Sequence, residues 1–249
     1  MQKNFNIAVL IDGDNAQPSL LKEILEEVAK YGKATIRRIY GDWTTNQMKG
    51  WKDIINLHSF SPIQKFSYTK GKNSTDSILI IDAMDILHEK NIDGFCIVSS
   101  DSDYTGLAKR IREHGVFVMG IGRKSTPMAF IQSCEIFTFC ENISNDHDKD
   151  EPLKKSRSTQ KKAKPEEVKP PEPQKGDLKN LDKAFEISIG EEEQVSVAQI
   201  GINLRKIDPS FDARDFGCRN LTQLFKNLQN YEVINNTVNG LNQPLVKRK

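Results

Sequence analysis

Short apolar runs alternate with helix-like segments along the N-terminal part of the chain, and this alternation limits the folds open to it. Five runs have strand length and are rich in β-branched and aromatic residues; they cover residues 5–11, 34–40, 62–68, 94–100 and 116–122. Segments with helical periodicity lie between them, at residues 18–30, 46–57, 75–88 and 102–113. This order predicts an α/β fold with a parallel, doubly wound sheet and helices on both faces.

Acidic residues follow two of the predicted strands. Asp12, Asp14 and Asn15 follow the first strand, and Asp101 and Asp103 follow the fourth. In the common strand order 3-2-1-4-5 these strands are neighbours, and ligands bind beyond the carboxyl ends of the strands at the switch in strand order. We therefore expect both groups to meet in one crevice.

Asp76 is a further candidate, because it lies at the start of the helical segment 75–88. Thr75 can cap this helix and so place Asp76 in the first turn. C-terminal to Asp76, the same side of the helix carries an apolar stripe, formed by Ile80, Ala83, Met84 and Leu87. Asp76 is expected where this inward-facing stripe ends.

Gathered carboxylates repel one another, so protons or a cation must neutralise them. Two unit charges about 4 Å apart cost about 4 kcal/mol at an effective dielectric near 20. A set of hard oxygen ligands without histidine or cysteine favours Mg²⁺ or Mn²⁺. Such an ion activates water and stabilises charge on a phosphodiester through one-metal or two-metal chemistry.

Most of these residues also have a structural interpretation. An Asp between a strand and a helix commonly caps the helix or forms a turn, which is the simpler explanation for Asp14 or Asp103 taken alone. Asp82 has apolar helical neighbours and is interpreted first as a half-buried carboxylate with a structural partner. Asp12 differs, because it ends a buried strand and has no capping role of its own.

Composition narrows the class of protein. The formal net charge is only +2, so any nucleic-acid binding must come from local patches. The first residues lack a signal-peptide pattern, and no segment approaches the ~18 apolar residues of a membrane span. The four cysteines show no metal spacing and are interpreted as reduced thiols. We expect a soluble cytoplasmic protein with no membrane association.

The chain also divides by composition. Residues 151–175 contain five prolines and twelve charged residues but no aromatic residue. Such a segment buries too little apolar surface to offset its ordering entropy, which predicts a flexible linker. The expected domains are 1–143 and 177–249, joined by a linker at 144–176.

Four motifs in the N-terminal domain carry a family resemblance. They read "VLIDGDN", "KGKNSTDSILIIDAMD", "IVSSDSDYTGLAKRIREHG" and "VFVMGIG". In order and approximate spacing, from about Asn6 to Ile143, they resemble the NYN domains of the PIN-like nuclease superfamily. The resemblance implies a PIN-like Rossmannoid sheet and a metal-dependent endoribonuclease activity on RNA.

The resemblance also implies roles for the acidic residues. Asp12, Asp76 and Asp101 match ligands of the Mg²⁺ or Mn²⁺ ion, and Asp103 completes or orients this catalytic set. Supporting roles fall to four further residues: Asp14, Asn15, Ser100 and Asp82. Ser100 stands where the "SGDSDF" form of the motif has glycine, and Tyr104 stands where it has phenylalanine.

The C-terminal part carries a second resemblance. Residues 196–234, "SVAQIGINLRKIDPSFDARDFGCRNLTQLFKNLQNYEVI", are similar to the OST-HTH (LOTUS) family. Two helices with apolar faces, a turn at Gly217 and a hairpin wing at "NNTVNG" predict a small winged-helix domain. The resemblance implies binding of RNA or of a protein partner such as an RNA helicase.

Basic and aromatic residues are candidates for RNA contacts. Lys70 and Lys72 precede Asp76, and Arg123 and Lys124 follow the fifth strand, so both pairs can rim the crevice. Unpaired bases could stack on Trp43, Trp51 or Tyr68, although the helical spacing of Trp51 favours a place in the core. The histidines are spread along the sequence and receive no ligand role.

Two other functions stay open at this point. "DGDN" has a superficial likeness to the DxD site of HAD phosphatases, where the first Asp is phosphorylated, but no later lysine motif supports that chemistry. Alternatively, the NYN domain is a catalytically silent RNA-binding or adaptor scaffold. The full acidic set argues against silence, because unused carboxylates that repel one another have no reason to persist.

Overall fold

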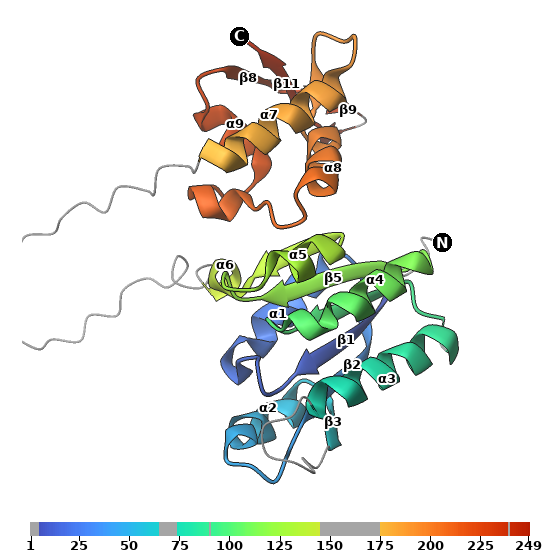
Figure 1. Ribbon diagram of the computed structural model, residues 1–249. Helices are drawn as coiled ribbons and strands as arrows, with labels where there is room; N and C mark the ends of the chain where they lie inside the picture. Colours follow the sequence, from blue (N-terminus) through green and yellow to red (C-terminus); the bar gives the residue numbers. More distant parts are fainter. Residues whose placement is uncertain (1–4, 65–73, 90, 145–174, 239) are drawn as a thin grey trace, which may run out of the picture. The chain divides into compact units, whose positions relative to one another are not determined.

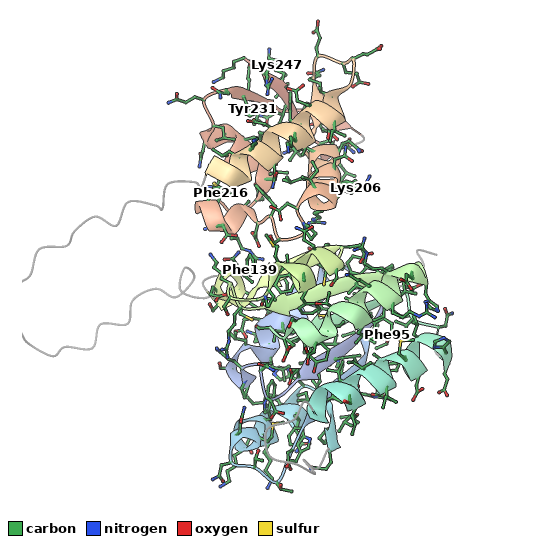
Figure 2. The ribbon with its side chains drawn as sticks, viewed as in Figure 1. Phe95, Phe139, Lys206, Phe216, Tyr231 and Lys247 are labelled. Atoms are coloured by element: carbon green, nitrogen blue, oxygen red, sulfur yellow. The ribbon has the colours of Figure 1, made fainter. Side chains whose placement is uncertain are left out.

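The computed structural model describes residues 5–64, 74–89, 91–144, 175–238 and 240–249, with the side chains at 74–76, 175–177 and 238 left undescribed. These residues pack as two units, one within Met1–Ser144 and the other within Asn145–Lys249 (Figure 1). Each unit has its own hydrophobic core, and Figure 2 labels one core residue of each, Phe95 and Tyr231. In the described parts of the chain, no helix is both long and apolar enough to cross a membrane.

The first unit is built on a six-stranded parallel sheet in the order β3-β2-β1-β4-β5-β6. The order of the first five strands is the expected one, and it makes β1 and β4 neighbours at the centre. The strands are β1 (Asn6–Asp12), β2 (Lys33–Gly41), β3 (Ser61–Gln64), β4 (Gly94–Val98), β5 (Phe117–Gly122) and β6 (Ile136–Phe139).

Helices cover both faces of the sheet, as the sequence predicted. Side chains of β1 alternate between two cores: Ala8 and Leu10 face one, and Ile7, Val9 and Ile11 face the other. The first core contains α3 (Ser74–Glu89), α4 (Thr105–Glu113) and α5 (Met128–Ser133); the second contains α1 (Leu21–Ala29), α2 (Lys52–Leu57) and α6 (Cys140–Ser144). Single turns precede three of the helices: η1 (Pro18–Leu20), η2 (Gln47–Trp51) and η3 (Ser102–Tyr104).

Several local expectations for this unit need correction. The sequence did not predict β6, because this strand has four residues and lies between two helices of six and five residues. The run at 62–68 yields only β3, and residues 65–68 lie outside the described residues. Residue 144 belongs to α6 rather than to the linker. Trp51 is 1% exposed, which confirms its place in the core and excludes it as a base-stacking surface.

The second unit is a small winged-helix domain. Its three-stranded antiparallel sheet has the order β7-β11-β8, and β9 and β10 pair as the expected hairpin. Gly217 adopts a left-handed conformation with φ 68°, which ends η5 before the next helix begins. The elements are α7 (Lys175–Ile189), β7 (Val195–Ser196), α8 (Val197–Ile207), η5 (Ala213–Phe216), α9 (Leu221–Asn227), β8 (Tyr231–Ile234), β9 (Thr237–Val238), β10 (Leu241–Asn242) and β11 (Leu245–Arg248).

Helix α7 was not predicted, and it begins two residues inside the expected linker. Residues 175 and 176 are polar or small, so composition grouped them with the charged segment before them. The helix is stabilised by later residues: Leu181, Ala184 and Phe185 are buried in the core of the second unit.

Candidate active site

Asp12 is the centre of the candidate site. It is the last residue of β1 and its side chain is fully buried. Its Oδ2 accepts hydrogen bonds from Asn15 Nδ2 at 2.7 Å and from Ser99 Oγ at 2.9 Å, and its Oδ1 accepts one from the Asp14 amide at 3.2 Å. A buried carboxylate loses its hydration, and these donors replace part of it while fixing the orientation of the group.

The backbone holds the loop that follows Asp12 against neighbouring elements. The Gly13 amide donates to the Tyr40 carbonyl at 2.8 Å, and Trp51 Nε1 donates to the Gly13 carbonyl at 3.2 Å. A Cβ at Gly13 would lie 2.7 Å from Met48 Cε and 2.8 Å from the Tyr40 oxygen, so only glycine fits here. The loop is therefore rigidly placed between β2 and η2.

The second acidic group follows β4, the neighbour of β1. The Asp101 amide donates to Ser99 Oγ at 3.1 Å, so Ser99 bridges Asp101 to the carboxylate of Asp12. Asp101 Oδ1 accepts from the Asp103 amide at 2.9 Å and caps η3. The capping role thus falls on Asp101 rather than on Asp103, which lies exposed in the first turn.

Ser99 is a residue that the sequence analysis missed. The motif pointed to Ser100 instead, because Ser100 stands where its "SGDSDF" form has glycine. In the structure, Ser100 Oγ accepts from the Arg123 amide at 2.9 Å, and Arg123 Nη2 donates to the Asn15 carbonyl at 3.3 Å. Ser100 and Arg123 therefore join the loops after β4, β5 and β1, whereas Ser99 contacts the buried carboxylate itself.

We predict that Ser99→Ala weakens the binding of Mn²⁺ at the Asp12 site. Removing a residue that hydrogen-bonds to a metal ligand and orients it typically lowers metal affinity or activity by about 10- to 100-fold. Ser100→Ala is the matched control, because among the described residues the Ser100 hydroxyl is bonded only to the Arg123 amide. Titrations of both variants with Mn²⁺ give the comparison. A larger effect for Ser100→Ala than for Ser99→Ala would contradict this assignment.

The remaining predicted residues have different placements. Asp76 lies in the first turn of α3, and its side chain is outside the described residues, as are Lys70 and Lys72. Arg123 and Lys124 are exposed at the end of β5, with Arg123 bonded to the Asp12 loop. The structure thus brings Asp12, Asn15, Asp101 and Arg123 together around the carboxyl ends of β1, β4 and β5.

Asp82 lies farther along α3 and contacts β2. Its two carboxylate oxygens accept from Arg38 Nη1 and from the Tyr40 hydroxyl. Arg38 and Tyr40 are two residues apart and so share one face of the sheet. Burial and the hydrogen bond to Asp82 raise the pKa of the Tyr40 hydroxyl, which keeps it protonated as a donor. Asp82 therefore fixes α3, and with it the backbone of Asp76, against the strand beside Asp12.

The side chains of the candidate site are of the kind that binds a divalent ion. Asp12, Asp101 and Asp103 supply only oxygen atoms, as Mg²⁺ and Mn²⁺ prefer. Among the described side chains, no three metal-binding groups are close enough together to hold an ion. The oxygen donors of Asp12, Asp101 and Asp103 suit such an ion by their chemistry. The fourth member of the expected set, Asp76, has a side chain that lies outside the described residues.

The six-stranded parallel sheet with helices on both faces fits a PIN-like α/β fold. The NYN domain model matches residues 6–144, more than half of the chain, and the chain belongs to the NYN domain family. The OST-HTH/LOTUS domain model matches residues 174–242, which identifies the second unit as a domain type associated with RNA binding.

Similarity to individual proteins is more remote. No curated protein sequence matches the chain. A similar solved structure is that of VPA0982, a protein of unknown function from Vibrio parahaemolyticus RIMD 2210633, with 20% sequence identity and a TM-score of 0.48. The match covers 57% of this chain and 98% of that chain.

Proposed function

We propose that this protein is a metal-dependent endoribonuclease whose C-terminal domain binds the RNA substrate or a protein partner. The observation that supports this most strongly is the buried carboxylate of Asp12, held by three donors at the edge of the sheet where Asp101 also lies. Ser99 links this carboxylate to the backbone amide of Asp101, so a second acidic residue is held beside Asp12 at the same edge of the sheet. We expect the negative charge of Asp12 and Asp101 to bind a cation, which in turn binds the RNA phosphate.

In the proposed site, Asp12, Asp76 and Asp101 would hold Mg²⁺ or Mn²⁺, and Asp103 would complete or orient the set. When bound, such an ion supplies an activated water and stabilises charge on the phosphodiester. Ser99 and Asn15 fix the orientation of the Asp12 carboxylate, which would reduce the reorganisation needed when an ion binds.

Other residues would position the RNA. The exposed Arg123 side chain lies against the Asp12 loop, where a guanidinium can hold a phosphate by paired hydrogen bonds. The charged segment between the two domains would act as a flexible tether, so that RNA bound by one domain meets the other at a raised effective concentration. We also propose that the protein acts in the reducing cytoplasm, which would keep the four free cysteines as thiols.

A direct test measures cleavage of single-stranded and hairpin RNAs by the purified protein with Mn²⁺, Mg²⁺ or EDTA. We expect internal cleavage with Mn²⁺ or Mg²⁺ and none with EDTA. Readdition of Mn²⁺ after removal of EDTA should restore the activity. RNA binding without cleavage under every metal condition would favour the alternative function, an RNA-binding or adaptor protein on an NYN scaffold.

A further inference from the structure

Two histidines that are far apart in the sequence meet at the ends of neighbouring helices. His88 lies in the last turn of α3, and His114 is the C-terminal cap of α4. These helices contact each other and lie side by side in Figure 1. The two imidazole rings have centroids 5.4 Å apart at an interplanar angle of 76°, and both side chains are exposed.

Hydrogen bonds define the state of both rings. His88 Nδ1 lies 2.7 Å from the Met84 carbonyl oxygen, and His114 Nδ1 lies 3.0 Å from the Arg110 carbonyl oxygen. A carbonyl oxygen only accepts, so Nδ1 carries the proton in each case. In the neutral ring this leaves the lone pair on Nε2. Neither Nε2 makes a hydrogen bond to another of the described residues.

We propose that His88 and His114 form a binding site for a divalent transition-metal ion, with Zn²⁺ as the representative. Metal-binding histidines characteristically donate their other ring N–H to a backbone carbonyl, as both rings do here. Two imidazoles at Zn–N distances of about 2.0–2.1 Å in tetrahedral geometry place their ring centres roughly 5 Å apart. The observed separation of 5.4 Å between the ring centroids is close to this value, so one ion can lie within reach of both exposed rings.

This site differs in chemistry and in place from the carboxylate site. Imidazole nitrogen suits Zn²⁺, Ni²⁺ or Cu²⁺, whereas oxygen ligands suit Mg²⁺ or Mn²⁺. Helix α3 begins near Asp76 and α4 begins just after Asp103, while the histidines lie at the opposite ends of both helices. A bound ion therefore ties together the far ends of the two helices that start at the acidic edge, with solvent water completing its coordination.

The test is a titration of the full-length protein, without a polyhistidine tag and freed of metal with EDTA, with ZnCl₂ in a calorimeter. We expect one Zn²⁺ bound per chain at this site. His88→Ala and His114→Ala should each weaken binding by about 10- to 100-fold, because even indirect partners of metal ligands have effects of that size. Long-range ¹H–¹⁵N spectra should show the Nδ1-protonated form of both rings and a Zn²⁺-dependent shift at both Nε2 atoms.

His58→Ala is the matched control, because His58 also ends a helix but has no second histidine against it among the described residues. It should bind Zn²⁺ as the wild type does. Asp12→Asn should also retain Zn²⁺ binding, and the His88→Ala/His114→Ala double variant should retain Mn²⁺-dependent cleavage. Unchanged Zn²⁺ affinity in a double variant with a wild-type circular dichroism spectrum would overturn the proposal.

Discussion

Replacing Asp12 by Asn should slow RNA cleavage by roughly 10²–10³-fold, the range seen when one preorganised electrostatic group is removed from an active site. The amide keeps the size of the carboxylate but removes its charge, and its one oxygen cannot satisfy all three donors that Asp12 accepts from. Single-turnover cleavage at saturating Mn²⁺ measures the chemical step without the contribution of RNA binding.

Asp85→Asn is the matched control for this experiment. Asp85 is exposed on α3, nine residues beyond Asp76, and the substitution makes the same change of charge. It should cleave RNA at the wild-type rate. Asp101→Asn should resemble Asp12→Asn, and RNA binding should persist in both. If Asp12→Asn and Asp101→Asn cleave like the wild type at saturating Mn²⁺, the proposed site is wrong.

Phe95→Ala should destabilise the first unit by about 3–5 kcal/mol and leave the second unit unaffected. Phe95 is fully buried on β4, and truncating such a side chain loses its transfer free energy and leaves a cavity. For a domain of this size the loss lowers the melting temperature by roughly 10–17 °C. Differential scanning calorimetry of the whole chain should show two transitions, of which only one moves.

The reciprocal variant is Phe225→Ala, which opens the same kind of cavity in the core of the second unit. It should lower or abolish the other transition and leave that of the first unit in place. Ile81→Ala is a surface control, since Ile81 is 60% exposed and its truncation should change stability by no more than about 0.5 kcal/mol. If each core variant shifted both transitions, the proposed division into independent domains would be incorrect.

Much of the fold was predictable because buried strands and helices require apolar residues in a regular pattern along the sequence. Strands covered on both faces must be apolar along their length, which is why β1, β4 and β5 appeared as continuous runs. Strand β6 did not appear, because four residues carry too little pattern to distinguish a strand from its surroundings. Helix α7 was not predicted, and the expected domain boundary at residue 177 falls two residues after the helix begins, because composition changes gradually along the chain while a helix begins at one residue.

The sequence predicted which strand ends carry the candidate site, but not which side chains contact each other there. Residues that follow neighbouring parallel strands must share an edge, so Asp12 and Asp101 could be placed together from the sequence. The choice between Ser99 and Ser100 could not be made in this way. Adjacent residues point in different directions, and only the backbone path after β4 decides that Ser99 meets Asp12 while Ser100 meets Arg123.

The sequence by itself determined the alternation of strands and helices, the two domain types and the carboxylates at the strand ends. These features depend on periodicity and on motifs within short windows. Only the tertiary structure decided that Asp82 meets Tyr40 and that His88 meets His114. Such contacts join residues on different elements, and they depend on how each helix is rotated and seated on the sheet, which no local pattern records.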